Sequence, residues 1–290
     1  MKIAVICPFQ NERSQGYAQG VIEHLLERKV TVLVDANMVQ FLEDPDVASY
    51  VSVFESLPLD TDFLFCIGGD GSMLRAIITV KDSNVPILGI NTGRLGFLTS
   101  LQKESLNIGL KQLWKNKYSI IKRSLLEVKL PDAHQEIDSF PYALNEISVN
   151  RKNTASLISI DTRLDDQPLT TYWADGLIIS TPTGSTGYSL SSGGPIMSPQ
   201  TAGFVLTPIA PHNLNIRPLI IPDNTRIELE VTGRGEDHLL SLDSRIISVD
   251  QGTKIQVKKA PFTVATVELH DNAFFKTLRD KLFWGLDTRN

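Results

Sequence analysis

Residues 62–78, DFLFCIGGDGSMLRAII, decide the fold of this chain. The run DFLFCI predicts a buried strand, and MLRAII carries the apolar spacing of a helix that begins near Ser72. The three glycines between them let the backbone adopt positive φ and let a ligand approach it closely. A strand that turns directly into a helix is typical of a β-α-β unit, in which ligands bind beyond the carboxyl ends of the strands.

The first third of the chain repeats this alternation on both sides of the glycine turn. Apolar runs at 3–7, 30–34 and 85–90 predict further strands, and residues 17–28 have helical spacing. Strands that alternate with helices indicate a parallel sheet covered by helices. We therefore expect an α/β domain at the N-terminus.

The pattern changes after about residue 100. A helix is expected within 105–117, and from residue 119 onward many short strand-like runs are separated by Gly, Pro, Asn and Asp. Such spacing is typical of a sandwich-like or barrel-like β domain. We predict an α/β domain over 1–100, a β-rich domain over 101–270, and a C-terminal helix within 271–290 that packs back on the first domain.

The composition is that of an ordinary soluble globular protein. The chain has 290 residues, of which 42% are apolar and 21% charged, and its net charge is −5. An acidic chain is a poor candidate for binding nucleic acid, so an anionic ligand must be held by local features. No apolar run is long enough for a membrane span or a signal peptide. The two cysteines form no disulfide framework, which favours a cytoplasmic location.

Asp70 is the unusual residue of the glycine turn. The turn matches neither G-x-G-x-x-G nor the P-loop, and a carboxylate at the N-terminus of a helix would repel a phosphate. One interpretation is that Asp70 deprotonates a hydroxyl or binds Mg²⁺; the other is that it caps the helix. Arg75, one turn later, is placed to reach a phosphate or to pair with an acid.

A long stretch without formal charge forms the second candidate site. Residues 176–216 contain no Asp, Glu, Lys or Arg, and eight of the thirteen residues from 180 to 192 are Ser or Thr. Hydroxyls and glycine N–H groups are neutral donors, which suit a polar ligand in a buried cleft. Tyr188 offers stacking or a hydroxyl contact. The alternative is a flexible surface loop.

Asn145 and Glu146 form a polar pair between apolar flanks. They are suited to hydrogen-bond ribose hydroxyls in a cleft, or they simply mark a turn or an edge. The five histidines have no metal-binding spacing, and the G-x-S-x-G motif of serine hydrolases is absent from the sequence. The sequence thus favours a site for a polar ligand over a metal centre or a hydrolase.

Taken together, these segments resemble the NAD kinase family. GGDG alone is shared with diacylglycerol-kinase-like and phosphofructokinase-like proteins, so the resemblance depends on several blocks in order. These blocks are GGDGSML (68–74), NTGRLGFL (91–98), LNEISV (144–149), YWADGLIISTPTGSTGYSLSSGGPI (172–196) and PIAPHNLNIRPL (208–219).

The resemblance implies a fold and a reaction. The fold would be a Rossmann-like α/β domain, similar to those of phosphofructokinases and diacylglycerol kinases, followed by a sandwich-like β domain. The reaction would be the Mg²⁺-dependent transfer of the γ-phosphoryl group of ATP to the 2′-hydroxyl of the adenosine ribose of NAD. The partners would be NAD and ATP, with neither nucleic acid nor membrane, and relatives usually form homodimers or homotetramers.

The resemblance also implies site residues. Asp70 would be the catalytic proton acceptor, while no residue is implied as a metal ligand. The implied NAD-binding residues are Asp70, Gly71, Arg75, Phe97, Asn145, Glu146, Asp175, Thr183, Thr186, Gly187, Tyr188, Ser189, Leu190 and Ser191. Two positions depart from the family: Trp173 stands where many relatives carry a basic residue, and Asp243 is followed by Ser244 where relatives often have Gly or His.

Two alternatives share part of this logic. A lipid kinase would carry a similar GGDG turn but needs an apolar entrance or an interfacial helix, and the sequence has no basic amphipathic stretch. A non-catalytic nucleotide sensor would keep the same cleft without needing Asp70.

Overall fold

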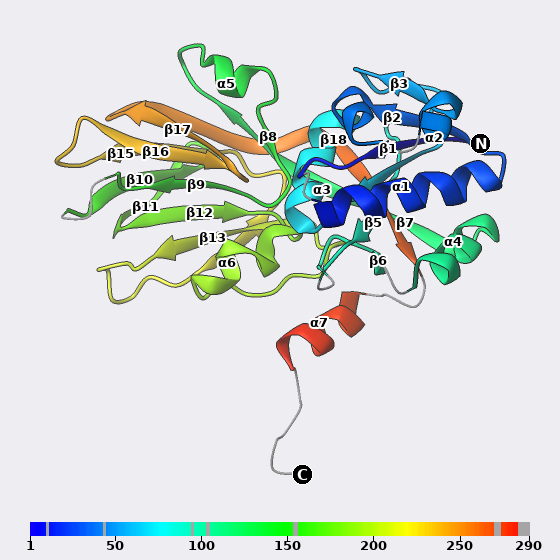
Figure 1. The fold of residues 1–290 in the computed structure, drawn as a ribbon. Coiled ribbons are helices and arrows are strands. Elements are labelled where there is room, and N and C mark those ends of the chain that lie inside the picture. The colour runs from blue at the N-terminus through cyan, green and yellow to red at the C-terminus, as the bar shows by residue number, and fades with distance from the viewer. Residues whose placement is uncertain are drawn as a thin grey trace, which may run out of the picture. The chain divides into compact units, whose positions relative to one another are not determined.

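The computed structural model describes residues 1–9, 12–42, 45–93, 96–102, 105–152, 156–269 and 274–283. The chain forms two compact units: Met1–Lys122 together with Val264–Asn290, and Arg123–Thr263 (Figure 1). These divisions differ from the sequence-based boundaries near 100 and 270, because two long strands continue from one unit into the other. They are β7 (Tyr118–Lys129) and β18 (Lys254–Leu269).

A parallel sheet forms the centre of the first unit. Its order is β3-β2-β1-β4-β5, and the last part of β18 pairs with β5 at Thr266 and Ile87. The strands are β1 (Lys2–Ile6), β2 (Thr31–Asp35), β3 (Ser52–Phe54), β4 (Phe63–Ile67) and β5 (Ile87–Asn91), with the short β6 (Leu101–Gln102) paired to β5. Every residue of β4 and β5 is buried, as expected for parallel strands covered on both faces.

Helices of the first unit bury apolar faces against its core. The expected helix at 17–28 is α1 (Glu12–Glu27), which buries Val21, Ile22 and Leu25. The helix after the glycine turn is α3 (Asp70–Val80); it begins two residues before the expected Ser72. The remaining helices are η1 (Ala36–Phe41), α2 (Pro45–Tyr50), α4 (Leu106–Trp114) and α7 (Phe274–Leu282).

Two antiparallel sheets form the second unit, as the layers in Figure 1 show. One has the order β14-β13-β12-β9-β16-β17, and the other contains β11-β10-β15 and the first part of β18. The strands are β8 (Tyr142–Ala143), β9 (Glu146–Asn150), β10 (Ile158–Leu164), β11 (Gln167–Ala174), β12 (Gly176–Ser180), β13 (Gly203–Ile209), β14 (Leu219–Pro222), β15 (Ile227–Thr232), β16 (Asp237–Leu242) and β17 (Arg245–Asp250).

Buried residues from both sheets share one core. Ile179 and Phe204 from one sheet lie in the same apolar cluster as Ile160 and Leu229 from the other. Short helices α5 (Gln135–Asp138), η3 (Gly184–Thr186) and α6 (Tyr188–Ser191) complete the unit. The predicted fold class, an α/β N-terminal domain with a β-rich sandwich-like domain, is confirmed.

In the part of the chain that the structure describes, no helix is long and apolar enough to cross a membrane.

Candidate functional site

The glycine turn after β4 leaves no room for a side chain at its first residue. Gly68 has φ 140°, and a Cβ there would come 2.0 Å from Ser72 Oγ, so only glycine is accommodated. Gly69 is the N-cap of α3, so Asp70 is the first helical residue, and in the described part of the chain no side chain caps the helix. The capping interpretation of Asp70 is therefore wrong.

Backbone donors hold the Asp70 carboxylate instead. The Phe97 N–H donates to Oδ2 at 2.8 Å, and the Leu98 N–H donates to Oδ1 at 3.1 Å. A Cβ on Gly96 would come within 1.7 Å of Asp70 Oδ1, so the loop closes directly over the acid. The carboxylate is partly exposed and has a fixed orientation.

The loop that carries Phe97 is itself anchored to β5. Asn91 Oδ1 accepts from the Gly93 N–H at 2.6 Å, and Thr99 Oγ1 accepts from Asn91 Nδ2 and from the Gly96 N–H. Arg94 and Leu95 of the NTGRLGFL block lie outside the described residues. Asn91 and Thr99 were missed as anchors of this loop. The polar NTG sequence directly after a buried strand points to Asn91, whereas no motif distinguishes Thr99.

Aromatic and basic side chains surround this turn. Arg75 is exposed on α3, and its guanidinium carbon lies 5.9 Å from the centre of the Phe9 ring. The Phe97 ring contacts Phe274 of α7, with centroids 6.3 Å apart, and Lys281 Nζ lies 5.0 Å from the centre of the Phe97 ring. Thus Asp70, Gly71, Arg75 and Phe97 lie around one end of the first unit's sheet.

The second unit holds Asn145 and Glu146 where β9 begins, and Asp243 fixes them. The Asp243 carboxylate accepts from the N–H groups of Leu144, Asn145 and Glu146 at 2.9, 2.8 and 3.2 Å. Asp243 itself occupies a turn with φ 52°, and its N–H donates to Glu146 O at 3.0 Å. Three converging N–H groups identify Asp243 as a positioning residue.

Burial changes the acidity of both carboxyl groups at this turn. Burial, reinforced by the nearby Asp243 carboxylate, raises the pKa of Glu146 to about 8. Burial also raises the pKa of Asp243, against the opposing effect of its three N–H donors and of the Arg245 guanidinium. Among the described residues no donor reaches Glu146 Oε2, which is buried. That oxygen is available to a ligand that donates a hydrogen bond.

The hydroxyl-rich stretch packs directly against Asn145 and Glu146. A Cβ on Gly184 would come 2.1 Å from Asn145 O, and a Cβ on Gly187 would come 3.4 Å from Glu146 Oε2. Thr181 and Ser185 are fully buried, so the surface-loop interpretation of this stretch is wrong. The structure therefore brings together two groups that are separate in the sequence.

Several of its hydroxyls stabilise the turn itself. Thr181 Oγ1 donates to Leu144 O at 2.6 Å, Ser185 Oγ accepts from the Met197 N–H at 2.9 Å, and Ser189 Oγ lies 2.8 Å from Thr207 Oγ1. In contrast, part of the stretch is accessible. Among the NAD-binding residues implied there, the accessible or partly accessible ones are Thr186, Gly187, Tyr188, Leu190 and Ser191.

Thr183 brings the hydroxyl-rich stretch, which has no charge of its own, into contact with a basic side chain. Its Oγ1 lies 3.2 Å from Nη1 of Arg123, a buried residue of β7. No motif in the sequence distinguishes Arg123 from other basic residues of that strand. Its proximity arises only from the pairing of distant segments in the second unit.

Asp175 lies apart from the other predicted residues of the second unit. It precedes β12, whose Gly176 pairs with Asn150, whereas Ser180 at the far end pairs with Glu146. The strand separates these two ends by roughly 14 Å at 3.4 Å per residue. Asp175 forms an ion pair with Arg151 at 3.0 Å, and neighbouring Trp173 is 55% exposed.

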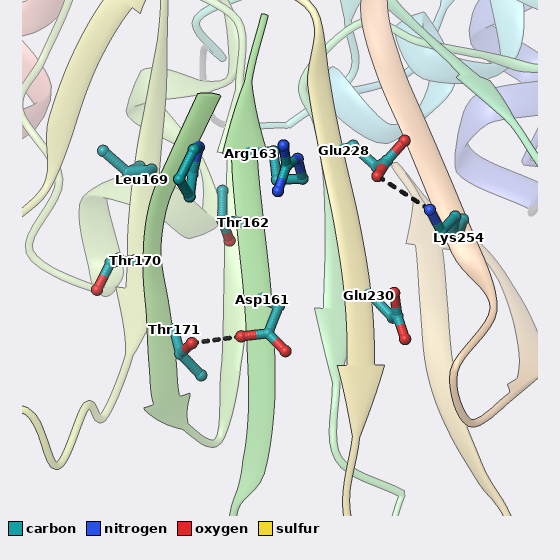
Figure 2. A pocket seen from close by; sticks show the side chains of 10 residues that line it. Asp161, Thr162, Arg163, Leu169, Thr170, Thr171, Glu228, Glu230 and Lys254 are labelled. Atoms are coloured by element: carbon teal, nitrogen blue, oxygen red, sulfur yellow. Dashed lines mark hydrogen bonds and ion pairs between the residues drawn. The ribbon is translucent and has the colours of Figure 1, made fainter. Parts of the chain in front are cut away.

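A hollow of about 420 Å³ lies on the outer face of β10, β11, β15 and β18 and contains none of the predicted site residues (Figure 2). Two of its acids interact within the sheet: Lys254 pairs with Glu228 at 3.6 Å, and Thr171 donates to Asp161. This hollow therefore lies apart from the residues of the candidate site.

The acidic and other metal-binding side chains among the described residues indicate how a metal ion could be held. Within these residues, no group of three or more His, Cys, Asp and Glu side chains is placed to hold a metal ion. Mg²⁺ commonly keeps several waters and binds one or two carboxylates together with the phosphates of a substrate. The single partly exposed Asp70 carboxylate fits that mode of binding.

Comparisons with known proteins cover both units. The ATP-NAD kinase N-terminal domain model matches residues 3–118, and the ATP-NAD kinase C-terminal domain model matches residues 144–269. An NAD kinase of Christiangramia forsetii is 48% identical and one of Flavobacterium psychrophilum 47% identical, each over the full length of both chains.

Solved structures agree with these matches. A crystal structure of yeast NADH kinase complexed with NADH has a TM-score of 0.85 and 25% identity, covering 99% of this chain and 89% of that one. An NAD kinase from Archaeoglobus fulgidus in complex with ATP has a TM-score of 0.75 and 28% identity, covering 98% and 99%. Matches to both family domains and near-half identity over full length lead to one conclusion: the chain belongs to the NAD kinase family.

Proposed function

We propose that this chain is an ATP-dependent NAD kinase that transfers the γ-phosphoryl group of ATP to the 2′-hydroxyl of the adenosine ribose of NAD, giving NADP and ADP. The observation that carries the proposal is the Asp70 carboxylate, held by the Phe97 and Leu98 N–H groups at the end of β4. Relatives named NAD kinase and the structure of a relative with ATP support it.

In this mechanism Asp70 accepts the proton of the ribose hydroxyl. The hydroxyl oxygen forms a bond to the γ-phosphorus, the bond between that phosphorus and the β–γ bridging oxygen breaks, and ADP leaves. Such transfers depend mainly on positioning and on neutralising charge. The two N–H donors orient Asp70 before the substrates arrive, because they fix both carboxylate oxygens.

The Asn145–Glu146 turn would hold the adenosine of NAD. Its amide and carboxyl groups accept and donate hydrogen bonds in a geometry fixed by Asp243. A ribose hydroxyl or adenine amino group donating to Glu146 Oε2 would satisfy a buried oxygen that has no donor among the described residues. The accessible residues of the 186–191 segment would contact the same adenosine.

Mg²⁺ would be held by the nucleotide phosphates together with the Asp70 carboxylate. When bound, the ion would neutralise phosphate charge during transfer. A cytoplasmic location, an assembly of two or four copies, and the absence of nucleic-acid and membrane partners remain proposals, based on composition and family resemblance.

The proposal is tested with purified protein, NAD, ATP and Mg²⁺, using an NADP-specific dehydrogenase to detect product. We expect NADP from the wild type and at least about a hundredfold lower turnover from Asp70→Asn, within the range of a general base. Binding of NAD, followed by calorimetry, should persist in this variant. Asp82→Asn, which changes an exposed acid just beyond α3, is the matched control and should keep wild-type turnover.

Two results would contradict the proposal. A folded wild-type protein that forms no NADP would exclude the activity. Near-normal turnover of Asp70→Asn would leave the activity in place but remove Asp70 as the proton acceptor.

A further inference from the structure

The first unit has a hollow of about 400 Å³ at the carboxyl ends of β1 and β2. Its volume is in the range of pockets that bind small molecules. It combines apolar, aromatic and polar walls with one acid and one base. Residues that line it include Pro8, Phe9, Asp35, Asn37, Arg75 and Thr79. Of these only Arg75 is among the residues that the NAD kinase resemblance implies.

The position of the acid is informative. Asp35 is the last residue of β2, which lies beside β1, and β1 lies beside the β4 strand that ends in the glycine turn. In open α/β sheets, ligands bind outside the carboxyl ends of the strands, and in dinucleotide-binding folds of this class an acid after the second strand hydrogen-bonds a ribose hydroxyl. Asp35 Oδ1 accepts from the N–H and Nδ2 of Asn37 at 2.9 and 2.8 Å, which orients the carboxylate.

An aromatic ring connects the hollow to the glycine turn. A Cβ built on Gly71 would lie 3.6 Å from Phe9 Cε2, so the Phe9 ring borders the turn. Arg75 lies over the same ring, and Phe9 is 51% exposed. Along α3, Arg75 stands five residues from Asp70, about 7.5 Å at 1.5 Å per residue. A chain of phosphates leaving the hollow toward Asp70 would pass this cation.

We infer that the hollow binds the nucleoside of the phosphoryl donor, with its ribose hydroxyls on Asp35 and its triphosphate directed past Arg75 toward Asp70. The charges determine the orientation of the nucleotide in the hollow. Asp35 repels phosphate and accepts hydrogen bonds from neutral hydroxyls, while Arg75 attracts phosphate. Phe9 and Pro8 supply apolar contact for a base. The inference rests on the proposed NAD kinase activity and assigns the donor's binding site.

The test compares two donors, ATP and 2′,3′-dideoxy-ATP, because the second lacks both ribose hydroxyls. For the wild type we expect kcat/KM to favour ATP at least about tenfold, as loss of hydrogen bonds to a charged acceptor predicts. In Asp35→Asn the KM for ATP should rise about fivefold or more, and the preference should fall below about threefold. The KM for NAD should stay the same, and Asp82→Asn should behave as the wild type.

A second variant tests the other end of the hollow. Arg75→Gln should raise the KM for both donors by the same factor, because both carry the triphosphate, and should leave the preference between them unchanged. Circular dichroism and thermal unfolding of each variant establish that it folds. Calorimetric titration of the two donors measures binding without turnover, so the hollow is tested even if no NADP is formed.

The inference is overturned if Asp35→Asn binds and uses ATP like the wild type. It is equally overturned if that substitution raises the KM for NAD instead, since the hollow would then serve the acceptor. Absence of NADP from the wild type would reject the proposed function. If calorimetry then showed that the wild type prefers ATP over the dideoxy donor and that Asp35→Asn does not, the nucleoside site would still be supported.

Discussion

Two acidic residues of this protein, Asp70 and Asp243, form hydrogen bonds with backbone N–H groups that are distant in the sequence. Asp70 is held by N–H groups about 27 residues away, and Asp243 holds N–H groups nearly a hundred residues away. GGDG indicated Asp70 as a candidate, because three glycines surround an acid directly after a buried strand, but helix capping stayed open from the sequence alone. Its role as proton acceptor stays a prediction. The role of Asp243 was not predictable, because its partners meet only after β9 and β16 have paired.

Asp243→Asn should weaken the binding of NAD more than it slows the chemical step. The amide would place donor hydrogens against at least one of three N–H groups, at a cost of about 1–3 kcal/mol in the free energy of unfolding. We expect the KM for NAD to rise about tenfold while kcat changes less than threefold. Steady-state kinetics and thermal unfolding measure both effects, and the exposed neighbour Ser244→Ala is the control. An unchanged KM would show that the turn keeps its shape without the carboxylate.

At the scale of elements, apolar runs predicted the positions of the strands in the α/β unit reliably. The runs at 62–67 and 85–90 became β4 and β5 within one or two residues, since fully buried strands are continuous apolar runs. The unit boundaries were less predictable. β7 and β18 each continue from one unit into the other, and a continuous strand gives no linker signal.

The segment between β12 and α6 lies close to the backbone of Asn145, and this close approach requires a glycine at position 184. Gly184→Ala should lower the free energy of unfolding by about 1–3 kcal/mol, because its Cβ would meet the backbone carbonyl of Asn145. Gly20→Ala is the matched control: nothing lies within 4 Å of that position in α1, and alanine should stabilise the helix by up to about 1 kcal/mol. Urea unfolding distinguishes them, and equal effects of both substitutions would refute the packing argument.

At the scale of the whole molecule, one buried histidine makes stability depend on pH. His238 on β16 is fully buried, neither ring nitrogen has a partner among the described residues, and burial lowers its pKa to about 4 against the attraction of Asp237 and Asp250. The unfolded chain takes up the proton near pH 6.5, so stability falls as the pH drops from about 6.5 to 4. Glu146, whose pKa is raised to about 8, acts oppositely between about pH 4.5 and 8.

His238→Leu should remove the histidine contribution and leave that of Glu146. Relative to the wild type, the variant should gain about 2–3 kcal/mol in the free energy of unfolding at pH 4.5 compared with pH 7.5. Urea unfolding at the two pH values measures the difference. If variant and wild type differed in the free energy of unfolding by the same amount at both pH values, His238 would take up its proton in the folded state as readily as in the unfolded chain.

The passage of β18 through both units has a consequence for synthesis on the ribosome. The second unit is an insertion within the first, whose last strand comes from residues after Thr263. Val267 and Leu269 belong to the core around β1 and β4, and Thr266 completes the edge beside β5. The nascent α/β unit therefore keeps an open strand edge and an incomplete core until residues 264–269 have emerged, and chaperones would be most needed during this interval.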